Sequence, residues 1–151
     1  MHPTDEVDAD FGRAVTQVGD IDGDGYHDIA VGAPGADAGG TNRGEVYIYM
    51  GDPDGIEATP ALVLSGTINE EAFGQSVAGG WDVNGDGYGD LIVGAPGYTG
   101  AHASEGAAFL YLGSAEGLSS TPSWNKTGGH CLLYTSPSPR DVEESRMPSS
   151  A

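Results

Sequence analysis

The chain has 151 residues, with 23 acidic and 5 basic side chains, a formal net charge of −18 and 26 glycines. So acidic a chain cannot neutralise phosphates, which argues against a nucleic-acid partner and against docking on anionic lipid. No apolar run reaches the roughly 18 residues of a membrane span, so we expect no membrane insertion, and the abundant glycine predicts short strands joined by tight turns.

Four short segments in the first half of the sequence are strand-like, because each is bounded by Gly, Pro or Asp. They cover 13–18, 28–33, 45–50 and 61–65. The third places Val46, Ile48 and Met50 on one face, and Tyr47 and Tyr49 on the other. Since both faces are apolar, both must be covered, as in a four-stranded propeller blade between neighbouring blades. A generic β-sandwich would alternate more cleanly with polar residues.

An acidic loop separates the first two predicted strands. Asp20, Asp22 and Asp24 alternate along it, followed by a glycine and then Asp28. Alternate carboxylates on a tight loop direct their oxygens toward one point, and a backbone carbonyl at Tyr26 would add another ligand. So many hard oxygen ligands favour Ca²⁺ over Mg²⁺, which retains more of its water. The predicted calcium ligands are Asp20, Asp22, Asp24, Tyr26 and Asp28.

The whole unit recurs later in the chain. Phe11-Gly12 returns as Phe73-Gly74, an offset of 73 − 11 = 62 residues, and the strand at 45–50 returns at 107–112. Two copies of one spacing favour a metal site over the alternative of a solvated acidic turn. The predicted ligands of the second loop are Asp82, Asn84, Asp86, Tyr88 and Asp90.

An EF-hand loop opens with the same spacing, but it also needs Glu at its twelfth position and flanking helices. That position holds Val31 in the first loop and Val93 in the second. The flanks are strand-like as well, so we exclude an EF-hand.

Each repeat contains three motifs in a fixed order: Phe-Gly, then Asp-x-Asp/Asn-x-Asp-Gly-x-x-Asp, then Gly-Ala-Pro. This order resembles that of the FG-GAP repeats of the integrin alpha-chain β-propeller. The two copies cover about residues 5–128. The resemblance implies a seven-bladed propeller on an extracellular or cell-surface protein, with Ca²⁺ between the first two strands of a blade, opposite the main ligand surface. We therefore predict an all-β fragment of about two four-stranded antiparallel blades. Because the repeats lack cysteine, the chain is more similar to bacterial or archaeal FG-GAP proteins than to animal integrins.

The end of the sequence has a different composition. All 26 glycines precede Cys131, and two blocks of 131–151 resemble the translation of transposase-type sequencing adaptors. We therefore divide the chain into a first repeat at 5–66, a second repeat at 67–130 and a non-native, disordered tail at 131–151.

The leading hypothesis is a non-enzymatic, calcium-binding module for adhesion or recognition outside the cytoplasm, with a protein or glycan ligand at a propeller face. The repeats offer no nucleophile–histidine–acid set and no acid pair beyond those assigned to calcium. The alternative is an accessory propeller domain of a secreted hydrolase or lyase whose catalytic domain lies outside this sequence. A calcium-responsive signalling protein is disfavoured, because the sequence predicts no helices that would move.

Overall fold

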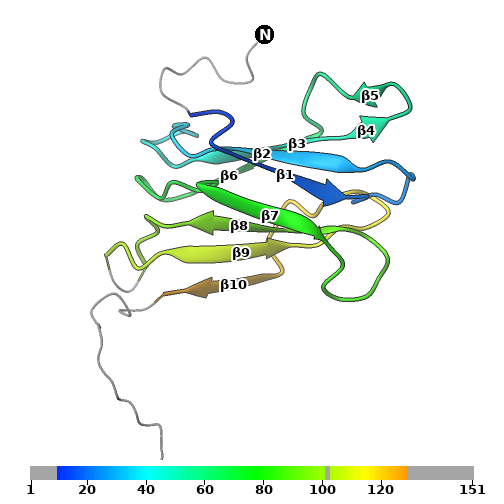
Figure 1. Ribbon diagram of the computed structural model, residues 1–151. Helices are drawn as coiled ribbons and strands as arrows, with labels where there is room; N and C mark the ends of the chain where they lie inside the picture. The colour runs from blue at the N-terminus through cyan, green and yellow to red at the C-terminus, as the bar shows by residue number, and fades with distance from the viewer. Residues whose placement is uncertain (1–9, 101–102, 129–151) are drawn as a thin grey trace, which may run out of the picture.

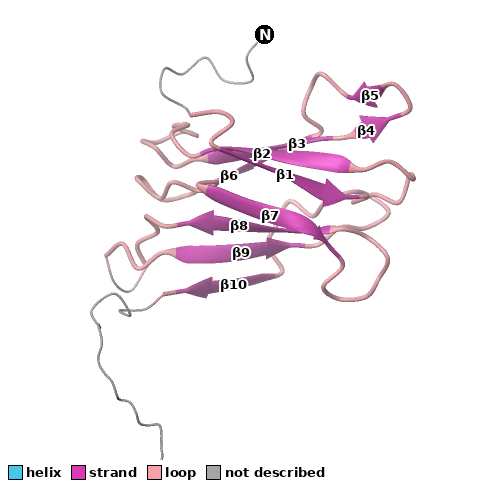
Figure 2. Ribbon diagram, viewed as in Figure 1, coloured by secondary structure: helices cyan, strands magenta, loops and turns pink. Residues whose placement is uncertain are grey.

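The computed structural model describes residues 10–100 and 103–128, and every regular element in these ranges is a β-strand (Figure 2). The predicted tail at 131–151 lies outside the described residues.

The first sheet is antiparallel and contains four strands in the order β1-β2-β3-β6. Its strands are β1 (Ala14–Gly19), β2 (Asp28–Ala33), β3 (Glu45–Tyr49) and β6 (Leu62–Ser65). Each lies within one residue of a segment that the sequence predicts, because Gly, Pro and Asp end the strands where the pattern indicates.

A short hairpin, which the sequence analysis did not predict, follows β3. It consists of β4 (Gly51–Asp52) and β5 (Gly55–Ile56), which pair antiparallel. The Asp52 side chain closes the turn by accepting a hydrogen bond from the Asp54 amide at 2.8 Å. Gly55 has a φ of 132°, which few other residues adopt, so turn chemistry rather than apolar periodicity forms this hairpin.

The second sheet repeats the first. It contains four antiparallel strands in the order β7-β8-β9-β10. These are β7 (Ser76–Trp81), β8 (Asp90–Ala95), β9 (Ala107–Tyr111) and β10 (Trp124–Thr127). Even the irregularities recur, since the register shifts between Gln17 and Gly19 in β1 and between Gly79 and Trp81 in β7.

The two sheets stack face to face, with β1 next to β7 (Figure 1). Val46 and Ile48 of the first sheet and Leu91 and Val93 of the second are fully buried in one core. Backbone approaches closely at this junction, because a Cβ on Gly32 would lie 2.1 Å from the Gly74 carbonyl oxygen.

The opposite face of the first sheet is also covered. Tyr47 and Tyr49 are buried there in a second cluster with Val31, and Phe11 packs against it. The prediction that both faces of β3 are covered is therefore confirmed. The structure has the all-β architecture of propeller blades that the sequence predicts.

Candidate metal centre

The two acidic loops occupy equivalent places in the two sheets. The first connects β1 to β2 and the second connects β7 to β8, so both lie at the same end of the stack (Figure 1). The sequence predictions therefore fall on two neighbouring loops.

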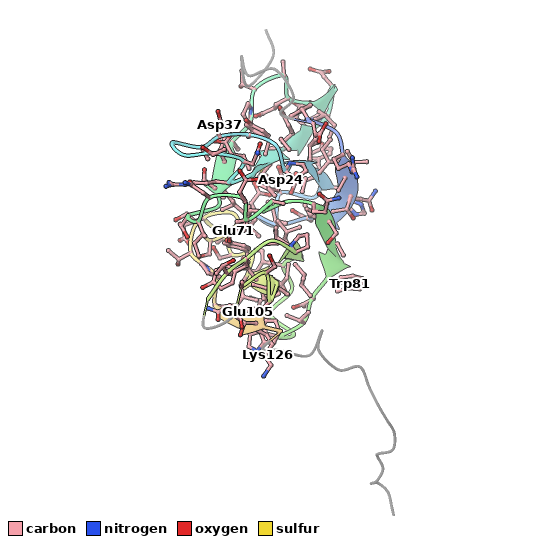
Figure 3. The ribbon with its side chains drawn as sticks, turned by 90° about the vertical axis from the view of Figure 1, so that its left-hand side faces the viewer. Asp24, Asp37, Glu71, Trp81, Glu105 and Lys126 are labelled. Atoms are coloured by element: carbon pink, nitrogen blue, oxygen red, sulfur yellow. The ribbon has the colours of Figure 1, made fainter. Side chains whose placement is uncertain are left out.

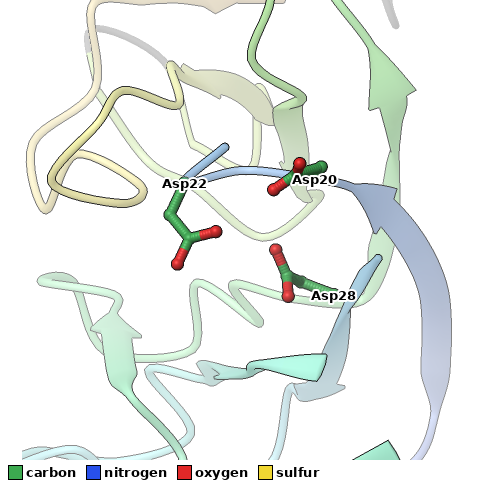
Figure 4. A group of neighbouring side chains, drawn as sticks. All are labelled: Asp20, Asp22 and Asp28. Carbon is green, nitrogen blue, oxygen red and sulfur yellow. The ribbon is translucent and has the colours of Figure 1, made fainter. Parts of the chain in front are cut away.

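The structure brings three of the predicted side chains of the first loop together. Carboxylate oxygens of Asp20, Asp22 and Asp28 all lie within 4.8 Å of one another, and the three side chains point toward a common space (Figure 4). The Asp24 carboxylate is not in this group. It accepts a hydrogen bond from the Tyr26 amide at 2.9 Å, which shapes the turn instead.

Asp20 organises the loop through backbone amides. Its carboxylate accepts hydrogen bonds from Gly23 at 2.7 Å, from Gly25 at 2.8 Å and from Asp24 at 3.1 Å. Burial acts to raise the pKa of Asp20, but the amides of Gly25 and Gly23 outweigh it and lower that pKa below its ordinary value. Asp20 is thus ionised before any cation arrives.

Asp28 has a structural role that sequence reasoning missed. Its fully buried carboxylate accepts one hydrogen bond from the Ile21 amide at 2.9 Å and another from the Gly51 amide at 2.8 Å. The side chain therefore ties the acidic loop to the start of β4. The available signal was the glycine that recurs 23 residues after this aspartate in both repeats, since 51 − 28 = 113 − 90.

Asp90 makes the same connection in the second repeat. Its carboxylate accepts hydrogen bonds from the Val83 amide at 2.8 Å and from the Gly113 amide at 2.9 Å. The last aspartate of each acidic loop is therefore part of the blade core as well as a candidate ligand.

Negative charge accumulates in the first loop. Burial raises the pKa of Asp28, and the nearby carboxylates of Asp24 and Asp20 raise it further. Burial likewise raises the pKa of Asp22, and the charges of Asp24 and Asp28 add to that effect. Like charges at this separation oppose ionisation, so a cation among them would be stabilised.

The second loop is arranged differently. Asp82 accepts hydrogen bonds from the amides of Gly87 at 2.7 Å and Asp86 at 3.0 Å, and that from Gly87 is the main reason its pKa is lowered. The Asn84 amide group donates to the Asp86 carboxylate at 3.3 Å. Among the described residues, the aspartates of this loop form no group of three, because Asn84 stands at the position of Asp22.

The two loops contact each other directly. The Gly89 amide donates to the Asp20 carbonyl at 3.0 Å. The first loop also contacts the segment after β9, since the Ser114 amide donates to the Ile21 carbonyl at 3.1 Å. The Tyr88 ring lies against Gly23, where an added Cβ would be 2.8 Å from its Cε1 atom. We therefore expect a change in the backbone conformation of one loop to shift the backbone of the other.

Comparison with known proteins is consistent with this repeated architecture. Integrin alpha-5 of Xenopus laevis is 45% identical over 89 residues, which cover 56% of this chain and 8% of the relative. Integrin alpha-V of Gallus gallus is 46% identical over 94 residues, covering 60% and 9%. Integrin alpha-IIb of Homo sapiens is 44% identical over 88 residues, covering 58% and 8%. The chain thus spans less than a tenth of the length of these relatives.

Within the described residues, no helix has the length and hydropathy needed to cross a bilayer. The FG-GAP repeat family model matches residues 11–49 and 73–111, the segments that run from the Phe-Gly pair to the third strand of each sheet. The chain therefore belongs to the FG-GAP repeat family.

Proposed function

We propose that this chain is a calcium-binding, non-enzymatic β-propeller module that serves adhesion or recognition at the cell surface or outside the cell. The observation that carries the proposal is the convergence of Asp20, Asp22 and Asp28, whose oxygens lie within 4.8 Å of one another. We propose residues 5–66 and 67–130 as its two repeating units.

The donor chemistry of the first loop fits Ca²⁺. All the gathered ligand atoms are carboxylate oxygens, and calcium binds oxygen at about 2.3–2.6 Å. Two ligands on opposite sides of such an ion lie about 5 Å apart, so oxygens within 4.8 Å of one another can share one ion. A cation would also offset the repulsion that raises the pKa values of Asp22 and Asp28.

We assign Asp24 and the Tyr26 carbonyl to the same first site, because they complete the alternating pattern of the loop. The second site would need a local rearrangement, since Asn84 turns its amide nitrogen toward Asp86 and would have to present its oxygen instead. The second site would be formed by Asp82, Asn84, Asp86, Tyr88 and Asp90.

The recognition role rests on the family resemblance. Integrin alpha chains match this chain at 44–46% identity over about sixty percent of its length or slightly less. We propose that the loops stabilise the blades and that a protein or glycan ligand binds a propeller face. The seven-bladed ring and the bacterial or archaeal origin stay predictions.

Thermal unfolding of the full chain in calcium, magnesium or EDTA tests the calcium proposal. Calcium at a hundredfold excess over its Kd should raise the free energy of unfolding of the chain by about 2.7 kcal/mol for each occupied site. Such a gain should raise Tm by roughly 10 °C. The double variant Asp20→Ala/Asp82→Ala should lose this response, whereas Asp54→Ala, in the exposed β4–β5 turn, should keep it. Equal stabilisation of both variants would show that calcium binds elsewhere.

A further inference from the structure

A cavity of about 290 Å³ opens between the two sheets, away from the acidic loops. Exposed residues at the end of β6 and in the segment before β10, including Ser65 and Ser120, line it. Phe73, Tyr111 and Glu71 are buried and also line it. Residues from both sheets or the segments next to them line the cavity, so it lies at the junction of the two blades.

Glu71 is an unusual residue to find in this wall. It is 1% exposed and lies between the two sheets (Figure 3). One carboxylate oxygen accepts hydrogen bonds from the amides of Thr67 at 2.8 Å and Ile68 at 3.0 Å. Among the described residues, no lysine, arginine or histidine pairs with Glu71, and its second oxygen accepts no hydrogen bond. Buried glutamates are seldom left without a cationic partner.

Tyr111 adds a second unsatisfied polar group. Its side chain is 4% exposed, yet its hydroxyl makes no hydrogen bond to a described residue. Buried polar groups usually have a partner, so this hydroxyl is a candidate contact for a ligand in the cavity. Burial, together with the charge of Glu71, raises the pKa of Tyr111 to about 12, so the phenol stays neutral near pH 7.

Phe73, Phe109 and Tyr111 form an aromatic part of the wall. The Phe73 ring lies 5.6 Å from that of Phe109 and 6.3 Å from that of Tyr111, measured between centroids. Aromatic faces attract organic cations, and a carboxylate beside them strengthens that preference. The equivalent position to Glu71 in the first repeat is Ala9, so the combination is specific to the junction between the blades.

We propose that this cavity binds a primary alkylammonium group, with the ammonium at Glu71 and the alkyl chain along the aromatic wall. A metal ion fits less well, because Glu71 is the sole carboxylate among the described lining residues. A quaternary ammonium fits less well too, because it has no N–H to donate to Glu71. The ligand is either a lysine side chain of a protein or a free amine.

Titration of the full chain with n-butylammonium chloride tests this site, with calcium and ionic strength held constant. The shifts of the Thr67 and Ile68 amides in NMR spectra report binding near Glu71. We expect a Kd of about 1 mM, the scale for so small a ligand. Tetramethylammonium should bind at least about tenfold more weakly, and 1-butanol should leave both amides unshifted.

Matched variants separate the carboxylate from the cavity. Glu71→Gln should weaken the binding of butylammonium by at least about tenfold, because it removes the charge that pairs with the ammonium. Glu70→Gln, at the exposed neighbouring position, should leave the binding of butylammonium unchanged. Tyr111→Phe provides a second probe if Glu71→Gln does not fold, and it should weaken binding a few-fold. Equal binding of butylammonium and 1-butanol, or of wild type and Glu71→Gln, would overturn the proposal, as would the absence of any shift at 50 mM, roughly fiftyfold above the expected Kd.

The source of the amine is resolved with Nα-acetyl-lysine methylamide. Binding as tight as that of butylammonium supports a protein lysine, and exclusion of the lysine derivative while butylammonium binds supports a free amine. The alkylammonium site does not depend on the calcium proposal, and Asp20→Ala should leave butylammonium binding unchanged.

Discussion

Replacing Phe73 with alanine should destabilise the chain far more than the equivalent change in the first repeat. Phe73 is 2% exposed between the sheets and contacts the rings of Phe109 and Tyr111. Removing a buried phenylalanine ring costs about 3–5 kcal/mol, and we expect about 4 kcal/mol because both sheets enclose this one. Phe11, its counterpart, is partly exposed and packs on the ring of Tyr47 at 5.3 Å. For Phe11→Ala we expect about 1–2 kcal/mol.

Urea unfolding followed by circular dichroism gives both free energies of unfolding. Because a loss of about 4 kcal/mol approaches the whole stability of a small domain, Phe73→Leu should be measured as well, with an expected loss of about 1–2 kcal/mol. Equal losses for Phe11→Ala and Phe73→Ala would refute the argument that Phe73 joins the two blades.

Three further predictions concern the acidic loops and Tyr111. Asp22→Asn should lower the calcium affinity of the first loop and Asn84→Asp should raise that of the second, because each added carboxylate ligand attracts the ion more strongly. Unchanged affinities in calorimetric titration would contradict this prediction. Asp82→Ala should also weaken the first site a few-fold, since the Gly89 amide bonds to the Asp20 carbonyl; an unaffected first site would show that the loops are independent. Burial, together with the charge of Glu71, raises the pKa of Tyr111 in the folded state to about 12 from an ordinary 10.0, so the contribution of Tyr111 to stability is complete below pH 10 and lost as pH rises through 12. Burial raises the pKa of Tyr49 as well, so absorbance titration should show late phenols, and Glu71→Gln should move only the Tyr111 part of that change to lower pH.

The strands could be predicted because their boundaries are local. Gly, Pro and Asp end each strand, and the two-residue alternation in 45–50 gives the correct faces of β3. The repeat then predicts the second sheet without further information. The β4–β5 hairpin was not predicted, because two-residue strands are too short to show a periodicity and this turn depends on the side chain of Asp52.

Features that depend on contacts between distant segments could not be predicted. Alternation shows that Phe109 and Tyr111 share a face, but not that this face meets the first sheet. The spacing of the first loop selects Asp28 as a ligand, but gives no sign that its oxygens also bond to Ile21 and Gly51. Glu71 lies outside both motifs, so only folding reveals its burial.

Equilibrium dialysis of the full chain against radioactive calcium tests the central claim most directly. The wild type should bind two calcium ions per chain at millimolar concentration. Asp20→Ala and Asp82→Ala should each lose one of these two tightly bound ions and retain the other. Retention of two equally tight ions in both variants, or no calcium bound by the wild type at millimolar concentration, would contradict the assignment of the two loops as metal sites.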